Sequence, residues 1–90
     1  MSARARKGPD AETVVARKGL GAAIRKLRQK RQLSQQVLAD RAGMSASWLS
    51  RIEAGSVEAR WGSLRKVAYA LDLTLPELIE EAERMEPRQI

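Results

Sequence analysis

Apolar positions recur every three or four residues along most of the chain, a spacing that indicates amphipathic helices. The clearest stripe predicts a first helix over about residues 19–31. Within residues 10–90 no stretch alternates apolar and polar positions as a strand does, so the pattern predicts an all-α fold of five helices. The stripes are, in chain order, Leu20, Ala23, Ile24 and Leu27; Leu38, Ala39 and Ala42; Leu49 and Ile52; Leu64, Val67, Ala68 and Leu71; and Leu78, Ile79 and Ala82.

The ends of the predicted helices carry capping residues. Ser34 and Ser45 suit the N-caps of the second and third helices, because a serine hydroxyl accepts a backbone N–H from the first turn. Gly43 ends the second helix where a left-handed backbone is easiest, only two residues before the next cap. Thr74 and Glu77 have the spacing of a capping box for the fifth helix. The second and third helices are therefore joined by a very tight corner.

The first third of the chain has a different pattern. Residues 1–9 lack apolar periodicity, and Asp10 would cap only a short helix, because Gly19 and Gly21 weaken any continuous extension. We expect a flexible basic arm over residues 1–18, one helical domain over residues 19–86 and a short tail over residues 87–90.

The net charge of +6 is unevenly distributed. Residues 1–31 carry ten basic and two acidic side chains, whereas residues 61–90 carry four basic and six acidic ones. The basic N-terminal third suits the binding of a polyanion such as nucleic acid, since Lys and Arg neutralise phosphates. A solvated charged surface would have the same composition, so charge alone does not decide between the two.

Several kinds of chemistry are excluded by composition. The chain has no cysteine and no histidine, which removes disulfides, the usual zinc sites and the commonest general base. We therefore expect neither a cofactor nor a metal, and no enzymatic activity. The absence of a membrane-length apolar run leads us to expect a cytoplasmic protein with no membrane partner.

Four motifs in register resemble the lambda-repressor-like, Cro/Xre-type helix-turn-helix family over about residues 19–80. They are L-S-Q from Leu33, L-A-x-x-A-G from Leu38, S-x-x-x-L-S-R-I-E-x-G from Ser45 and L-x-x-x-A-x-x-L from Leu64. The resemblance implies a compact five-helix DNA-binding domain with the helix-turn-helix at helices 2 and 3. In this arrangement the second helix crosses the DNA backbone and the third enters the major groove.

The outer face of the third predicted helix supplies the candidates for base recognition: Ala46, Ser47, Ser50 and Arg51. A guanidinium group pairs bidentately with guanine, so Arg51 is the strongest of them, with a phosphate contact as its alternative. Ala46 would contact a thymine methyl group or simply permit close approach.

A second set is expected to contact the DNA backbone: Gln35, Ser45, Trp48 and Arg60. The resemblance makes Gln35 both a phosphate clamp and a brace for the third helix; a solvated glutamine is the alternative. Trp48 would stack on the sugar-phosphate backbone or pack on a neighbouring helix, and Arg60 would contact phosphate or remain solvated. Trp61 is expected to anchor the core. The arm would follow the minor groove through Arg4, Arg6, Lys7, Arg17 and Lys18.

The resemblance also implies a partly buried ion pair between Arg28 and Glu53, which would orient the third helix without contacting bases. Two positions depart from the family's pattern. Val37 stands where a capping-box glutamate is common, and Ala59 stands where proline is usual.

Together these features predict a sequence-specific regulator of transcription that binds double-stranded DNA and is associated with the nucleoid. We expect a repressor that binds a two-fold symmetric operator as a homodimer, with half-sites roughly 34 Å apart. The candidate dimer face would equally cap the core of a monomer; it comprises Leu75, Leu78, Ile79 and Ala82.

An antitoxin is the alternative function. Such a protein neutralises a toxin partner and binds DNA to regulate its own operon. The acidic segment "PELIEEAERMEP", residues 76–87, would bind the toxin.

Overall fold

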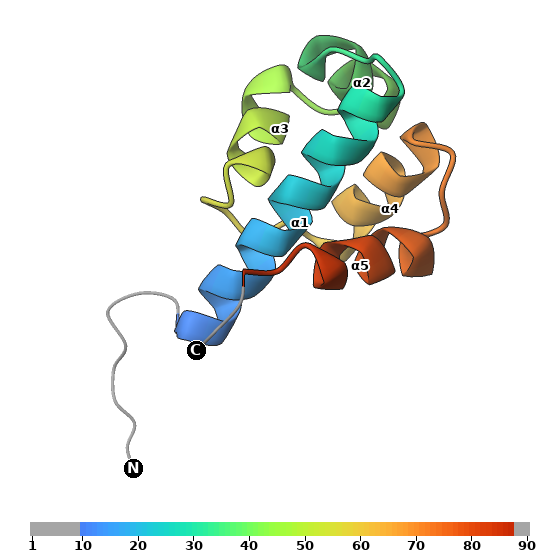
Figure 1. Cartoon of the computed structure of the whole chain (residues 1–90). Coiled ribbons are helices and arrows are strands. Elements are labelled where there is room, and N and C mark those ends of the chain that lie inside the picture. The colour runs from blue at the N-terminus through green and yellow to red at the C-terminus, as the bar shows by residue number, and fades with distance from the viewer. Residues whose placement is uncertain (1–9, 88–90) are drawn as a thin grey trace.

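The computed structural model describes residues 10–87, which fold into five helices (Figure 1). No strand occurs within these residues, so the predicted all-α, five-helix fold is confirmed. The helices are α1 (Ala11–Lys30), α2 (Gln35–Ala42), α3 (Ala46–Glu53), α4 (Trp61–Ala70) and α5 (Leu75–Arg84).

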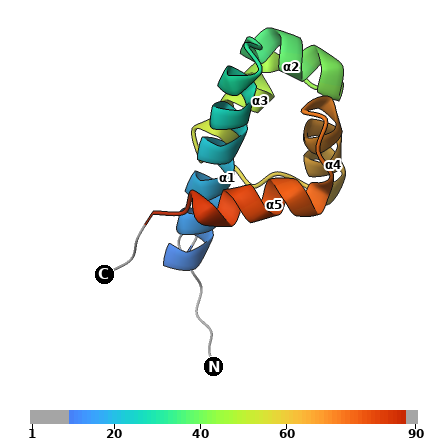
Figure 2. The same ribbon diagram turned by 45° about the vertical axis from the view of Figure 1, so that its right-hand side comes forward.

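The long helix α1 forms one side of the bundle, and α3 and α5 pack against it. It contacts α3 at Gly21 and α5 at Gly19 and Lys26, while α2 packs on α3 and α4 (Figure 2). Helix α4 also packs on α5, which closes the bundle. The residues that fill its centre come from all five helices and include Ile24, Leu38, Leu49, Ile52, Val67 and Leu78, together with Leu71 just after α4.

Helix α1 begins earlier than the sequence pattern predicted. Asp10 caps it by accepting the Thr13 N–H at 2.8 Å, and the helix then continues without a break through Gly19 and Gly21. The assignment of residues 11–18 to a flexible arm is therefore wrong. Residues 1–9 lie outside the described part of the chain.

The two glycines persist in α1 because neighbouring helices approach its backbone there. A Cβ atom at Gly19 would lie 2.5 Å from the carbonyl oxygen of Ala82 in α5. At Gly21 it would meet the carbonyl oxygens of Ile52 and Glu53 at the end of α3. Glycine lowers the stability of a helix by about 1 kcal/mol relative to alanine. At these two positions it allows α1 to pack closely against α3 and α5.

The predicted caps are present. The Ser34 and Ser45 hydroxyls accept the backbone N–H groups of Val37 and Trp48 at 3.1 and 3.0 Å. Gly43 has a φ of +70°, in the left-handed region. The capping box at the start of α5 is complete, with Thr74 and Glu77 bonded in both directions.

The prediction for Trp61 is wrong, and the burial of the candidate dimer face corresponds to its core-capping alternative. Trp61 is largely exposed at the start of α4 and does not anchor the core. Of the four residues assigned to a dimer face, Leu75, Leu78 and Ala82 are buried within this single chain. They are buried because the apolar stripe of α5 packs against α1 and α4 of the same bundle. Only Ile79 is exposed.

An ion pair ties α1 to α5 on the surface. Lys26 Nζ donates to Glu81 Oε2 at 2.8 Å, and Arg84 also bonds the Glu81 carboxylate. The hydrogen bond from Lys26, supported by Arg84, lowers the pKa of Glu81 below its ordinary value. The carboxylate of Glu81 is therefore favoured in the folded state.

This lowered pKa predicts a loss of stability in acid. The contribution of Glu81 is fully present above the ordinary carboxyl pKa of about 4.3 and disappears as the pH falls through the lowered pKa. In thermal unfolding, wild type should melt above a Glu81→Gln variant at pH 7, and the two melting temperatures should converge in acid. The neighbouring exposed Glu80→Gln is the control. A difference in melting temperature that is the same at neutral and acidic pH would contradict a lowered pKa for Glu81.

Candidate nucleic-acid interface

The corner between α2 and α3 is built around Gly43. The N–H groups of Gly43 and Met44 donate to the carbonyl oxygens of Asp40 and Ala39 at 3.2 and 2.9 Å, which satisfies the last turn of α2. The chain then reaches the Ser45 cap and turns directly into α3. The tight corner fixes the direction in which α3 leaves α2.

The two sides of α3 differ in character. Leu49 and Ile52 are fully buried and hold the helix on the bundle. On its other side Ser47, Ser50 and Arg51 are exposed, and Ala46 at its first turn is half-buried. The four residues predicted to contact bases thus begin the helix and continue along its outer face, where small side chains leave room for close approach.

A partly buried polar cluster holds the C-terminal end of α3. Arg28 Nε and Nη2 donate to the two carboxylate oxygens of Glu53 at 2.7 and 3.0 Å. The Arg28 and Glu53 side chains are only 11% and 4% exposed. Gln35 Nε2 donates to Glu53 Oε1 at 2.9 Å, and Arg28 Nη1 donates to the Leu33 carbonyl oxygen at 2.9 Å. We call Arg28, Glu53 and Gln35 the brace; it joins α1, α2 and α3.

The Arg28 guanidinium stays charged within the brace. The hydrogen bonds to Glu53 raise the pKa of Arg28 above its already high ordinary value, although burial acts in the opposite direction. A charged, bidentate pair of this kind is geometrically specific as well as strong. It therefore fixes the rotation of α3 relative to α1 and α2.

The residues predicted to contact the DNA backbone lie in different environments. The Gln35 amide is engaged in the brace at the start of α2, and its phosphate contact remains a prediction. Trp48 is half-buried and packs against the core, which corresponds to the packing alternative. Arg60 is exposed immediately before α4, and Ser45 is exposed at its cap.

The basic residues assigned to the arm do not form one group. Arg17 and Lys18 lie within α1, and the Arg17 guanidinium packs against the bundle, 3.8 Å from the Glu58 carboxylate. Its buried Nε has no hydrogen-bond partner among residues 10–87. Arg4, Arg6 and Lys7 lie outside the described residues.

Sequence reasoning missed two features of this region and its surroundings. One is the close contact between the α1 backbone at Gly21 and the end of α3. The pair of glycines beside an apolar stripe could have indicated it. The other is the exposed group of Trp61, Arg65 and Tyr69 on α4, whose last two members have the i, i+4 spacing of helix neighbours. In the part of the chain that is described, no helix is long and apolar enough to cross a membrane.

Comparison with known proteins places these features in context. Residues 19–82 match a family described as "Helix-turn-helix domain". An uncharacterized HTH-type transcriptional regulator from Sinorhizobium fredii is 42% identical over 52 residues, which are 58% of this chain and 26% of that protein. The chain thus corresponds to about a quarter of the length of this relative.

Two solved structures resemble the fold. The clp gene regulator ClgR from Corynebacterium glutamicum has a TM-score of 0.73 at 30% identity, covering 77% of this chain and 73% of that one. The restriction-modification controller protein C.AhdI from Aeromonas hydrophila has a TM-score of 0.67 at 32% identity, covering 69% of this chain and 94% of that one.

Proposed function

Because the chain belongs to the helix-turn-helix domain family, we propose that it regulates transcription by binding specific sequences of double-stranded DNA through α3. The observation that carries the proposal is the pairing of two features of α3. Its outer face presents Ser47, Ser50 and Arg51 to solvent, and its far end is held by the partly buried brace. A recognition helix needs both an open polar face and a fixed orientation.

The residues divide by role in the proposed complex. Arg51 donates to the O6 and N7 atoms of a guanine in the major groove, and Ala46, Ser47 and Ser50 lie against the neighbouring bases. The N-terminus of α2 with Gln35, together with Ser45 and Arg60, contacts the phosphate backbone and sets the register. Arg4, Arg6 and Lys7 extend the contact into the minor groove.

We further propose that the protein is a homodimeric repressor. A symmetric dimer binds a two-fold symmetric operator, and occupation of such a site blocks transcription without a further domain. The names of the similar proteins support a role in gene regulation, since they describe regulators of clp genes and of restriction-modification.

Selection from a random duplex library tests this function. We expect a two-fold symmetric motif to be enriched, and the selected duplex to bind at least about 10³-fold more tightly than shuffled DNA at physiological salt. Affinity for shuffled DNA should fall steeply with salt, because it depends on phosphate contacts. Failure to enrich a motif, with equal affinity for all duplexes, would contradict specific recognition.

Replacing Arg51 by alanine should relax the preference at one base pair in each half-site. The loss of a bidentate arginine-guanine contact costs about 1–3 kcal/mol of discrimination. Competition binding with single-base variants of the selected duplex measures this loss of discrimination. Arg84→Ala, which removes the same charge from α5, is the control and should leave the preference intact. Uniform weakening on all sequences would instead assign Arg51 to a phosphate.

The antitoxin alternative has weaker support. It gives partner binding to residues 76–87, but α5 occupies most of this segment and buries Leu78 and Ala82 in the core. Deleting the segment would therefore remove part of the fold itself. A toxin partner would have to bind the outer face of α5 while its inner face remains packed.

A further inference from the structure

An open groove of about 490 Å³ lies between α1 and the C-terminal end of α3. We call it the α1–α3 groove. Its α1 side is formed by Lys18, Ala22, Arg25 and Gln29, whose spacing places them along one face of the helix. Its other side includes Ala54, the residue at which α3 ends. The groove therefore joins the first helix to the proposed recognition helix.

The α1–α3 groove continues the outer face of α3. Ser50 and Arg51 are exposed on that face, and Ala54, three to four residues later, is exposed as well. Residues at this spacing follow one another along one side of a helix. Gly55 comes next and lies against α1, because a Cβ atom placed on it would be 3.3 Å from the Cα and Cγ atoms of Lys18. A duplex that follows the outer face of α3 to its end therefore meets this groove.

The α1–α3 groove presents two cations that lack an acidic partner. Lys18 and Arg25 are exposed, and neither side chain forms an ion pair or a hydrogen bond within residues 10–87. Glu53 also lines the groove, but its side chain is only 4% exposed and is bonded to Arg28. A third cation, Lys26, already holds the ion pair with α5. The unpaired charge in the groove is therefore positive.

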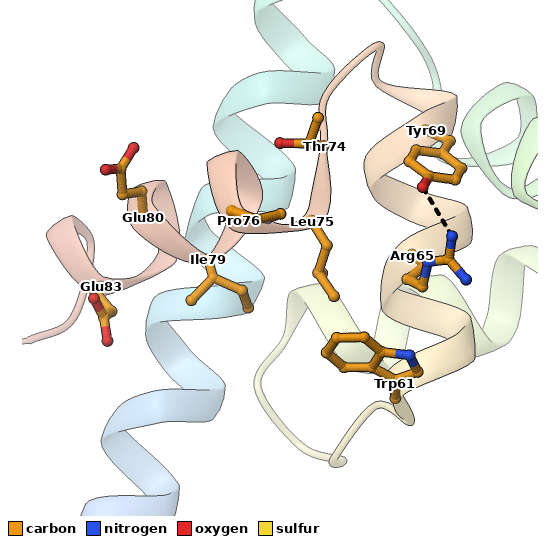
Figure 3. A pocket seen from close by; sticks show the side chains of 9 residues that line it. All are labelled: Trp61, Arg65, Tyr69, Thr74, Leu75, Pro76, Ile79, Glu80 and Glu83. Atoms are coloured by element: carbon orange, nitrogen blue, oxygen red, sulfur yellow. Dashed lines mark hydrogen bonds between the residues drawn. The ribbon is translucent and has the colours of Figure 1, made fainter.

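The groove between α4 and α5 has a different charge (Figure 3). It has a similar volume of about 450 Å³, but Glu80 and Glu83 line its α5 side. Its cation, Arg65, donates to the Tyr69 hydroxyl at 2.9 Å. The two carboxylates would repel a phosphate, so of these two grooves the α1–α3 groove is the one that suits a polyanion.

We propose that the α1–α3 groove holds the phosphate backbone of the duplex alongside the bases that α3 contacts; the proposal rests on the DNA binding through α3 proposed above. Lys18 and Arg25 each donate to a phosphate oxygen. They are seven residues apart, which is about 10 Å along a helix, so each meets a phosphate of its own. The small side chains of Ala22 and Ala54 let the backbone approach closely. For Lys18 this contact takes the place of the minor-groove contact expected from the sequence, because Lys18 lies within α1.

Neutral phosphate analogues in the selected duplex test these contacts. Methylphosphonates are introduced one at a time along each strand, including the flanking base pairs, and the dissociation constant is measured at fixed salt. We expect two positions in each half-site at which wild type loses about threefold in affinity, the size of an exposed ion pair, and at which a variant with Lys18→Gln and Arg25→Gln loses nothing further. The variant's plot of log affinity against log salt should be shallower by about 0.9 for each lost phosphate contact.

Arg65→Gln with Lys66→Gln is the matched control, because it removes the same charge from α4. The control should keep the wild-type response at both phosphate positions. All four substituted residues are exposed, so thermal unfolding should show that both variants fold. The variant in the α1–α3 groove should also keep its preference among single-base variants of the motif, because phosphate contacts carry no sequence information.

The outcomes separate this proposal from the proposed function. If the groove variant kept the wild-type response to every methylphosphonate while its motif was unchanged, the groove contacts would be overturned and recognition through α3 would stand. A loss of base preference in the groove variant would overturn the assignment of Lys18 and Arg25 to phosphates. Failure of the library to enrich any motif would overturn recognition through α3, and these contacts with it.

Discussion

Replacing Glu53 by alanine is expected to lower the free energy of unfolding by about 3–5 kcal/mol. The substitution leaves the Arg28 guanidinium, which is 11% exposed, without its carboxylate, and leaves the Gln35 amide without its acceptor. A buried charge that loses its partner retains the full cost of its desolvation. Since small domains have stabilities of about 5–15 kcal/mol, this one change should remove a large fraction of the total.

Urea denaturation followed by circular dichroism measures this loss. Glu58→Ala is the matched control, because Glu58 is 69% exposed and lies 3.8 Å from its arginine partner, so a change within about 0.5 kcal/mol is expected. Removing both charges, with Arg28→Met and Glu53→Leu together, should cost less than removing Glu53 alone. If Glu53→Ala behaved like the control, the brace could not be what holds α3.

Replacing Gly21 by alanine should also destabilise the protein, by about 1–3 kcal/mol. Alanine is the better helix former by about 1 kcal/mol, so local propensity alone predicts the opposite sign. The new methyl group would meet the carbonyl oxygens of Ile52 and Glu53, which belong to backbone and cannot rotate away. Helix α3 must then move outward from α1, which also strains the Arg28–Glu53 pair.

Gly62→Ala provides the control for this prediction. Gly62 also lies in a helix, but a methyl group placed there meets nothing within 4 Å. It should leave the melting temperature unchanged or raise it, whereas Gly21→Ala should lower it. If both substitutions raised the melting temperature equally, α1 and α3 could move apart without a loss of stability.

The sequence predicted the parts of the fold that local chemistry controls. Ser34, Gly43 and Ser45 locate the corner because capping and a left-handed backbone depend on the residue itself. The outer face of α3 followed from its periodicity, since the burial of Leu49 and Ile52 leaves Ser47, Ser50 and Arg51 outside. The pairing of Arg28 with Glu53 came from the resemblance to a family.

Features that depend on packing between distant segments were predicted less well. The start of α1 was misplaced because helix propensity counts Gly19 and Gly21 as weaknesses, while their advantage arises only where α3 and α5 approach. Periodicity identified Leu78 and Ala82 as one apolar stripe, but it cannot say whether the same chain or a second copy covers them. Trp61 was assigned to the core because it enters the fourth helix near Leu64, but its side chain is exposed.

The most direct test of the account is the pattern of backbone amide shifts when the labelled protein is titrated with the duplex obtained by selection. We predict the largest changes at the start of α2 around Gln35 and over residues 45–51, where the cap and outer face of α3 lie. Large DNA-dependent shifts confined to α4 and α5, with residues 45–51 unaffected, would contradict recognition through α3.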